Sequence, residues 1–262
     1  MFYEFPSEAE WEALISQFPR DRLALGREQF LPLRNDPIAG LTLLDVFHHW
    51  DTRKFALQLS YGMVLFYFQK GIPDDNWVDS SGDSGATFAY FPEFTDRDHF
   101  TKLQFDYHVE AFFLKIFSCW DTIGHILNIL YDLGIKQRNV TFHATVNALE
   151  RKDMSAFELF DSVRKDECGS FKNAKKIRLG YVHNYIPTTI GPSIRRVSGP
   201  SETYEGHAGE YTTSKEIVST VHGSLDLLAR TAEYVKQPCS YLVGPEKVDL
   251  RRTLAIEGGF WV

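Results

Sequence analysis

Hydrophobic residues recur every three or four positions along four long stretches of the chain, which is the pattern of helices that bury one face. The longest stretch predicts a helix over roughly 104–134, with Gly134 placed to end it. Its apolar positions are Phe105, Val109, Phe112, Phe113, Ile116, Phe117, Trp120, Ile123, Leu127 and Leu130. A second stretch predicts a helix over 213–237, and the spacing Thr213-x-x-Glu216 is typical of a capping box at its start.

The other two long stretches are less regular. A helix is predicted over 40–70, and the polar run His48, His49, Asp51 and Arg53 indicates a kink or a polar layer within it. A fourth helix is predicted over 169–186. Its apolar side consists of Phe171, Ala174, Ile177, Tyr181 and Tyr185. Shorter helices are expected at 7–18 and 141–165.

Four long helices predict an all-α fold, an up-down four-helix bundle that forms one domain over 1–262. Two insertions interrupt it. Residues 72–100 are acidic, turn-rich and aromatic, so we expect a short hairpin there, whereas residues 187–212 are rich in Gly, Pro, Ser and Thr and read as a long mobile loop. The tail 240–262 contains strand-like pieces, so a small β element is expected near 72–100 or at the C-terminus.

Composition narrows the class of protein. Of the 262 residues, 44% are hydrophobic and 15% aromatic, which indicates an ordered globular chain. The net charge of −7 argues against a generally basic nucleic-acid coat, although a local basic face remains compatible with it. Three scattered cysteines define no disulfide framework or zinc spacing. We see neither a signal peptide nor an apolar run long enough for a bilayer, so we expect a cytoplasmic protein with no membrane partner.

The common catalytic and nucleotide-binding motifs are missing: the chain has no P-loop, dinucleotide-binding glycine motif, nucleophile elbow or His-Glu-x-x-His. Helical Asp/His neighbours do occur, Asp45 with His48 and His49, and Asp121 with His125. Each pair shares a helix face and could hold a metal or orient a histidine. Because nine histidines produce such neighbours by chance, we expect no metal and no cofactor.

The segment Lys175–Pro187 carries a basic edge. At about 100° per residue, His183 lies roughly 160° from Tyr181 around the helix, opposite the apolar side. Lys172, Lys176 and Gly180 fall near the side of His183. One interpretation is a solvated basic face whose terminal histidine is favoured by the helix dipole.

The other interpretation is a reactive pair. Arg178 lies about 140° from His183 around the helix, so the two would meet through the long arginine side chain, a loosened helix end before Pro187, or a symmetric partner. Arginine suits a phosphate and its extra-negative transition state, and histidine exchanges protons at neutral pH. Together they would suffice for metal-independent RNA cleavage by the ribose 2′-OH, which DNA lacks.

At these residues the chain resembles the HEPN superfamily, small all-α bundles of prokaryotic defence and toxin systems and of some eukaryotic RNases. The family signature R-x(4–6)-H is similar to Arg178-Leu-Gly-Tyr-Val-His183 here, followed by Asn184 and Tyr185. The stretch DTIGHILNILYDLGI also looks like the family's earlier core helix, in which Asp121 or His125 would be the polar residue that faces the motif. The chain departs from the family pattern at Leu179, where many members carry a polar residue, and in its two insertions.

The resemblance implies a homodimer that brings two motifs into one cleft and acts as a metal-independent endoribonuclease of a defence or toxin–antitoxin system. Arg178 would hold the phosphate, His183 would be the acid and base, and Asn184 and Tyr185 would orient the site. Lys172 and Lys176 would attract RNA, and an antitoxin or another protein would be a further partner.

Two alternatives stay open at this point. One is a non-catalytic HEPN-like module that binds RNA, a nucleotide or a protein. The other is a metal-binding helical-bundle enzyme, which would need several histidines to converge: His48, His49, His108, His125 and His222.

Overall fold

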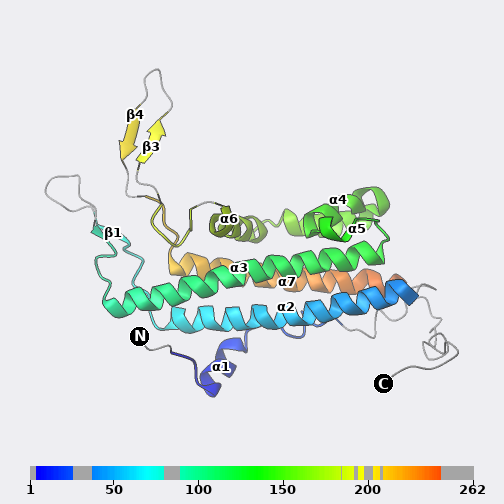
Figure 1. Ribbon diagram of the computed structural model, residues 1–262, viewed down its shortest axis with the longest axis horizontal. Coiled ribbons are helices and arrows are strands. Elements are labelled where there is room, and N and C mark those ends of the chain that lie inside the picture. Colours follow the sequence, from blue (N-terminus) through cyan, green and yellow to red (C-terminus); the bar gives the residue numbers. More distant parts are fainter. Residues whose placement is uncertain are drawn as a thin grey trace. The chain divides into compact units, whose positions relative to one another are not determined.

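The structure is a computed structural model that describes residues 4–25, 37–79, 89–183, 185–191, 194–197, 203–206 and 209–242. The described chain is mostly helical (Figure 1), which confirms the all-α class. Its α-helices are α1 (Glu8–Ile15), α2 (Pro37–Gln69), α3 (Asp96–Leu130), α4 (Phe142–Lys152), α5 (Met154–Arg164), α6 (Ser170–His183) and α7 (Ser214–Leu242). A 3₁₀ turn, η2 (Gln137–Asn139), precedes α4.

The four predicted long helices correspond to α2, α3, α6 and α7. The capping box of α7 is present, because the Glu216 carboxylate accepts from the Thr213 backbone N–H at 2.9 Å and the Thr213 hydroxyl accepts from the Glu216 N–H at 3.3 Å. The single helix expected over 141–165 is in fact two helices. Asp153 is extended (φ −154°) after α4, and its carboxylate accepts from the Ala156 N–H at the start of α5.

The end of α3 differs from the sequence prediction. The helix ends at Leu130, before the predicted stop at Gly134, because Asp132 already adopts a left-handed conformation with φ +47°. The Leu133 N–H then donates to the Asn128 carbonyl at 3.1 Å, which closes the last turn. The Asn128 side chain also accepts from the Ile135 N–H at 3.1 Å, so the following chain is held against the helix end.

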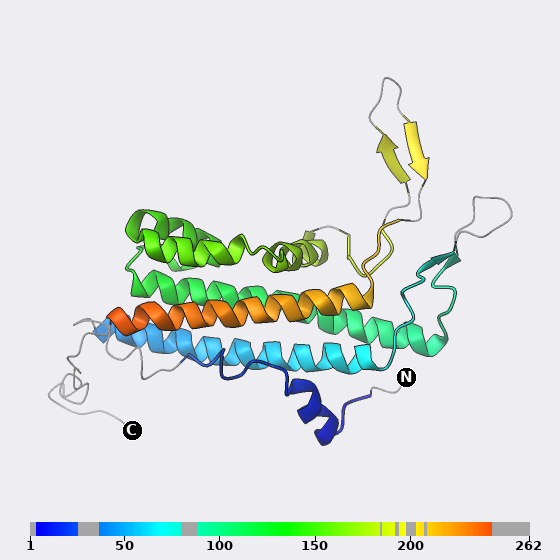
Figure 2. The same ribbon diagram turned by 180° about the vertical axis from the view of Figure 1, so that it is seen from behind.

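The chain forms two compact units by its internal contacts. Unit 1 comprises Met1–Pro19, Lys54–Phe117 and Arg164–Leu227, and unit 2 comprises Arg20–Arg53, Ser118–Val163 and Leu228–Val262. In each unit, segments of α2, α3 and α7 lie side by side (Figure 2). The expectation of a single domain over 1–262 stays a prediction.

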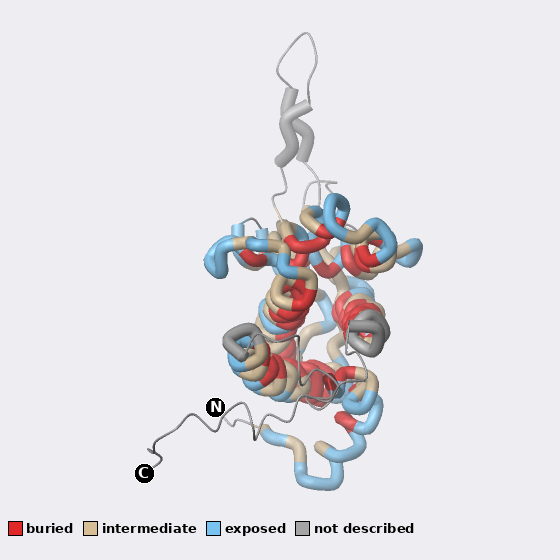
Figure 3. Tube along the Cα trace, turned by 90° about the vertical axis from the view of Figure 1, so that its right-hand side faces the viewer, coloured by how far each residue is buried: buried red, intermediate tan, exposed pale blue. Residues whose placement is uncertain are grey.

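Unit 1 packs around aromatic side chains. The Tyr61 ring of α2 lies 6.5 Å from that of Phe112 in α3 and 5.7 Å from that of His222 in α7. Helix α6 packs on α3 through Phe117 and Phe171, whose ring centres are 5.5 Å apart. Buried residues, red in Figure 3, recur every three or four positions in α3 and α6, as the apolar spacing predicts, whereas residues 60–67 of α2 are buried on every side.

In unit 2, the buried Trp120 and the half-buried Arg53 join the helices through hydrogen bonds. The Trp120 indole N–H donates to the Thr231 hydroxyl at 3.3 Å, which joins α3 to α7. The Arg53 guanidinium of α2 donates to the Ser118 carbonyl at 2.9 Å and to the Thr122 hydroxyl at 2.5 Å. Helix α2 is continuous through the polar run His48–Arg53, in which His48 and His49 are exposed and Arg53 makes the bonds to α3.

Both insertions contain antiparallel hairpins. The predicted hairpin in 72–100 pairs β1 (Val78–Asp79) with β2 (Ala89–Tyr90). The loop expected over 187–212 instead contains a pairing of β3 (Ile194–Val197) with β4 (Thr203–Gly206), with Ile194 opposite Gly206 and Val197 opposite Thr203. The prediction of a loop was wrong for these two pieces, because the Gly, Pro, Ser and Thr around them hid two short runs that contain the strand-forming residues Ile194, Val197 and Tyr204.

The C-terminal tail, for which strands were predicted over parts of 240–262, begins as helix. Helix α7 continues to Leu242, so residues 240–242 are helical rather than extended. The remainder of the predicted tail, 243–262, lies outside the described residues.

Candidate functional site

Helix α6 carries the Arg/His motif and has one buried edge. It begins at Ser170, whose N–H donates to the Asp166 carboxylate at 2.9 Å. Its buried residues are Phe171, Ala174, Ile177 and Gly180. Lys172 and Lys176 are exposed, as the helical wheel predicts.

Two residues of this segment lie differently from the prediction. Gly180 belongs to the buried edge rather than the outward one, because a Cβ there would lie 2.8 Å from Cγ and Cδ of Pro187. Tyr185, predicted to continue the apolar side, is 72% exposed. The reason is that α6 ends at His183, and the chain then turns back so that Pro187 covers Gly180.

Arg178 is half-buried on an aromatic ring. Its guanidinium carbon lies 5.1 Å from the centre of the Phe117 ring in α3, a cation–π distance. Its Nε is shielded from solvent and makes no hydrogen bond. Within the described ranges no carboxylate forms an ion pair with the Arg178 side chain. A guanidinium held this way can still receive an anion.

His183 ends α6 and is exposed to solvent. It is therefore accessible to a ligand. Asn184, the next predicted site residue, lies outside the described residues.

Asp121 and His125 lie in the unit 2 segment of α3, whereas Arg178 and His183 lie in unit 1. The Asp121 carboxylate accepts from the Phe142 N–H at 3.0 Å, in the first turn of α4. Burial lowers the pKa of His125, and the charge of Arg53 lowers it further against the opposing effect of Asp121. That either residue faces the motif stays a prediction.

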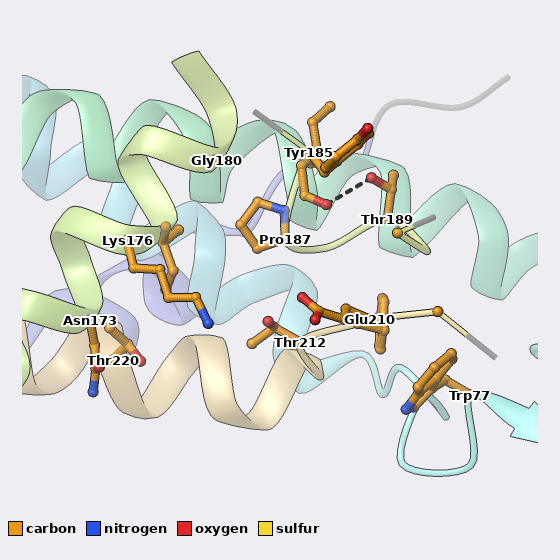
Figure 4. Close-up of a pocket in the computed structure, with 15 residues that line it drawn as sticks. Trp77, Asn173, Lys176, Gly180, Tyr185, Pro187, Thr189, Glu210, Thr212 and Thr220 are labelled. Carbon is orange, nitrogen blue, oxygen red and sulfur yellow. Dashed lines mark hydrogen bonds between the residues drawn. The ribbon is translucent and has the colours of Figure 1, made fainter. Parts of the chain in front are cut away.

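A pocket of about 670 Å³ lies beside the motif segment in unit 1 (Figure 4). Helix α6 contributes Asn173, Lys176, Ile177 and Gly180, and α7 contributes Thr220. The two chain segments at the base of the β3–β4 hairpin form the opposite wall. These segments line the pocket with Tyr185, Ile186, Pro187, Thr189, Gly191, Gly209, Glu210, Tyr211 and Thr212, and the first insertion adds Trp77.

Backbone hydrogen bonds tie the two wall segments together. The Gly191 N–H donates to the Glu210 carbonyl at 2.8 Å, and the Thr212 N–H donates to the Pro187 carbonyl at 2.9 Å. Gly209 has φ +99°, and a Cβ there would lie 2.9 Å from the Gly191 carbonyl oxygen. The close approach of these two segments therefore requires glycine.

A buried polar network holds the wall on the helices. The Asp74 carboxylate, 1% exposed, accepts from the Tyr211 hydroxyl at 2.5 Å, the Ser214 N–H at 2.8 Å and the Ser214 hydroxyl at 2.7 Å. Ser214 is the first residue of α7, so a carboxylate sits at a helix N-terminus, where it is stabilised. Burial and the neighbouring Asp74 carboxylate together raise the pKa of Tyr211.

A second part of this network involves Lys102 of α3. Its ammonium donates to the Asp106 carboxylate at 2.6 Å and to the Thr188 carbonyl at 2.7 Å. Burial raises the pKa of Asp106 to about 6, although the Lys102 charge opposes that shift. The Tyr181 hydroxyl lies 3.0 Å from that of Thr188, so α3 and α6 both anchor the wall.

A comparison with protein-family models matches residues 51–237 to a HEPN family described as Cthe2314-like HEPN. The match spans well over half of the chain and includes the Arg178–His183 motif. The chain belongs to the HEPN family. No curated protein and no solved structure matches it.

Sequence reasoning missed most of the pocket of this HEPN protein. Trp77, Glu210 and Thr212 come from insertions, and Thr220 lies on a helix known only by its apolar side. Of the lining residues, Lys176 and Tyr185 had predicted roles, Lys176 because its charge could be placed on the outward edge of α6 and Tyr185 because it follows the Arg/His motif. Aromatic and turn residues cluster in both insertions, but this pattern did not indicate that the two insertions line the same pocket.

The histidines proposed for a metal-binding enzyme do not converge. Among the described residues, no three His, Cys, Asp or Glu side chains form a group that could hold a metal ion. The closest Asp/His pair of α2, Asp45 and His49, is 3.6 Å apart and well exposed. None of the described helices is long and apolar enough to cross a membrane.

Proposed function

We propose that this HEPN protein is a metal-independent endoribonuclease that works as a homodimer, with Arg178 and His183 as its catalytic residues. Membership of the HEPN family supports the proposal, together with the solvent exposure of His183 at the end of α6. The proposal includes a cytoplasmic role in a defence or toxin–antitoxin system, with an antitoxin or another protein as a partner.

One observation carries the proposal: Arg178 is half-buried, yet its Nε lacks a hydrogen bond and the described residues offer it no carboxylate. A buried charge without a compensating partner is costly to the fold. An arginine kept in that state is well suited to a ligand that brings its own negative charge. A phosphodiester fits the guanidinium, which can donate two parallel hydrogen bonds to it.

The chemistry follows from the residue types. His183 in its neutral form accepts the proton of a ribose 2′-OH while O2′ attacks the adjacent phosphorus. The bond from phosphorus to O5′ breaks, and O5′ takes a proton from a protonated imidazole, which the second copy of His183 in the homodimer would supply. The products are a 2′,3′-cyclic phosphate and a 5′-hydroxyl. Arg178 stabilises the additional negative charge of the pentacoordinate transition state.

The supporting residues have less direct roles in this proposal. Lys172 and Lys176 on the exposed edge of α6 attract the RNA backbone. Asn184 and Tyr185 orient the strand beside His183. Asp121 or His125 acts as the polar group facing the motif.

The test uses the purified full chain with structured and unstructured RNA in EDTA. We expect cleavage that ends in a cyclic phosphate, no cleavage of DNA, and loss of at least about 100-fold in Arg178→Ala and His183→Ala. RNA that is bound but not cut would favour the binding-only HEPN module instead. Cleavage that persists unchanged in both variants would show that Arg178 and His183 are not catalytic. A monomeric mass in light scattering would exclude the homodimer and its shared cleft.

A further inference from the structure

The pocket beside α6 presents opposite charges from its two walls. Lys176 reaches into it from α6, and the Glu210 carboxylate is turned toward the same space from the hairpin base (Figure 4). Both side chains are exposed, and they form no ion pair with each other. The space between them is part of the volume of about 670 Å³, which is large enough for one nucleotide.

We infer that this pocket binds one nucleotide of a single-stranded RNA and selects bases that carry an exocyclic amino group. The inference rests on the proposed ribonuclease function, and it adds a specificity site that contains neither Arg178 nor His183. The α6 end of the pocket would hold a phosphate, the opposite end would hold the base, and Glu210 would bind the amino group of that base.

The α6 end of the pocket fits a phosphate. Lys176 supplies a positive charge, and the Asn173 amide and the Thr220 hydroxyl supply neutral donors from α6 and α7. Ammonium, amide and hydroxyl groups are the usual contacts to a phosphate backbone. Lys176 precedes Arg178 by two residues on the same helix, so a strand held here is close along the chain to the proposed catalytic residues.

The opposite end of the pocket fits a base. Trp77 lines this end and contacts Tyr211, with ring centres 5.5 Å apart, while the exposed Tyr185 ring lines another part of the wall. Aromatic side chains stack on nucleobases of single strands without regard to sequence. These rings therefore contribute affinity for any base, and a different group must provide the selectivity between bases.

Glu210 supplies the selection. A carboxylate accepts hydrogen bonds only, so it pairs with the amino group of cytosine, adenine or guanine. Uracil has no amino group, and its N3–H lies between two carbonyl oxygens whose lone pairs repel a carboxylate. The hydrogen bond from the Gly191 N–H to the Glu210 carbonyl fixes the backbone from which this carboxylate projects.

The experiment measures binding without cleavage. Fluorescein-labelled 2′-O-methyl pentamers of cytidine, adenosine or uridine cannot be cut through the 2′ oxygen, so their fluorescence anisotropy reports affinity even if the protein is not a nuclease. We expect the cytidine and adenosine pentamers to bind about tenfold more tightly than the uridine pentamer. Glu210→Gln removes or reverses this preference, because a glutamine amide can donate to O4 of uracil and accept from its N3–H.

Lys176→Ala tests the phosphate end of the pocket, and Lys175→Ala, an exposed neighbour outside the pocket, is its matched control. Lys176→Ala should weaken all three pentamers about fivefold and reduce the salt dependence of binding by about one ion, whereas Lys175→Ala should change the affinities and their salt dependence much less. Glu158→Gln, on exposed residue Glu158 of α5, is the control for Glu210→Gln.

Three outcomes would overturn the inference. They are equal affinity for the three pentamers, a base preference that survives Glu210→Gln, and equal effects of Lys175→Ala and Lys176→Ala. Cytidine and uridine monophosphates are also tested, as competitors of the labelled pentamers. If the free nucleotides bind as tightly as the pentamers, the pocket binds a free nucleotide and the assignment to an RNA strand is wrong.

Discussion

The guanidinium carbon of Arg178 lies 5.1 Å from the centre of the Phe117 ring. Phe117 is itself fixed, because its ring packs on Phe171 at 5.5 Å and is 8% exposed. A ring face attracts a cation without using its N–H donors. Arg178 is thus positioned by packing while its hydrogen-bonding capacity remains available for an anion.

Arg178→Met separates function from stability. A long apolar side chain can keep the packing on Phe117, and it removes a half-buried charge that lacks a carboxylate partner among the described residues. We therefore expect RNA cleavage to fall at least about 100-fold while the free energy of unfolding in urea stays equal or rises by about 1 kcal/mol. Lys175→Met on the same helix is the control and should retain cleavage. A loss of about 2 kcal/mol or more in Arg178→Met would indicate a structural role instead.

Gly180→Ala should destabilise the protein at the contact between α6 and the following turn. The added Cβ would lie 2.8 Å from two ring carbons of Pro187 and 3.0 Å from the Tyr185 carbonyl oxygen, so the turn must shift. The expected loss in unfolding free energy is about 1–3 kcal/mol. Gly40→Ala in α2 is a matched control, because no atom lies within 4 Å of the added Cβ, and it should stabilise the helix by about 0.5–1 kcal/mol. Equal effects of the two substitutions would contradict the packing of Pro187 on Gly180.

Asp74→Ala should be far more damaging than Asp75→Ala. Asp74 is buried and accepts three hydrogen bonds from Tyr211 and Ser214, whereas Asp75 is exposed. Removal of the Asp74 carboxylate leaves three donors without their acceptor, two of them buried, so we expect a loss of about 3 kcal/mol, compared with less than about 0.5 kcal/mol for Asp75→Ala. Chemical denaturation of both variants measures the difference. Similar values would mean that the network does not anchor the start of α7.

Asp106→Asn should change how stability depends on pH. The folded-state pKa of Asp106 is about 6, above its ordinary value of 3.8, because burial disfavours the carboxylate. The folded protein then binds the proton more tightly than the unfolded chain, so this group makes the unfolding free energy fall as the pH rises from about 4 to about 6. The full effect is about 3 kcal/mol.

The measurement is the difference in unfolding free energy between Asp106→Asn and the unmodified protein at pH 4, 5, 6 and 7. Since asparagine does not titrate, the variant should gain stability relative to the unmodified protein across this window. Asp75→Asn provides the control for a surface carboxylate. A difference in unfolding free energy that is constant between pH 4 and 7 would contradict this prediction. So would a variant that loses stability relative to the unmodified protein as the pH rises, since the Lys102 charge would then outweigh burial and keep the Asp106 carboxylate charged.

The helices and the Arg/His motif were accessible from the sequence because local rules govern them. Apolar spacing located α2, α3, α6 and α7, and the capping box at Thr213 requires only residues three positions apart. The family resemblance at Arg178–His183 was likewise carried by a short segment, and the family match confirms it. Boundaries were less predictable: Asp132 already takes a left-handed conformation two residues before Gly134, which is left-handed as well, so α3 ends earlier than predicted.

The tertiary structure decided what each face of these helices meets. The wheel placed Gly180 outward, but the chain returns after His183 and Pro187 covers it. Asp74 caps α7 from 140 residues away, and Trp77, Lys176 and Glu210 share a pocket although they come from three separate segments. The sequence by itself determined which residues can form a helix and which can carry a proton or a phosphate. Only the packing of distant segments decided which of those residues share a site, because such contacts depend on chain reversals and backbone pairing that leave no periodic trace in the sequence.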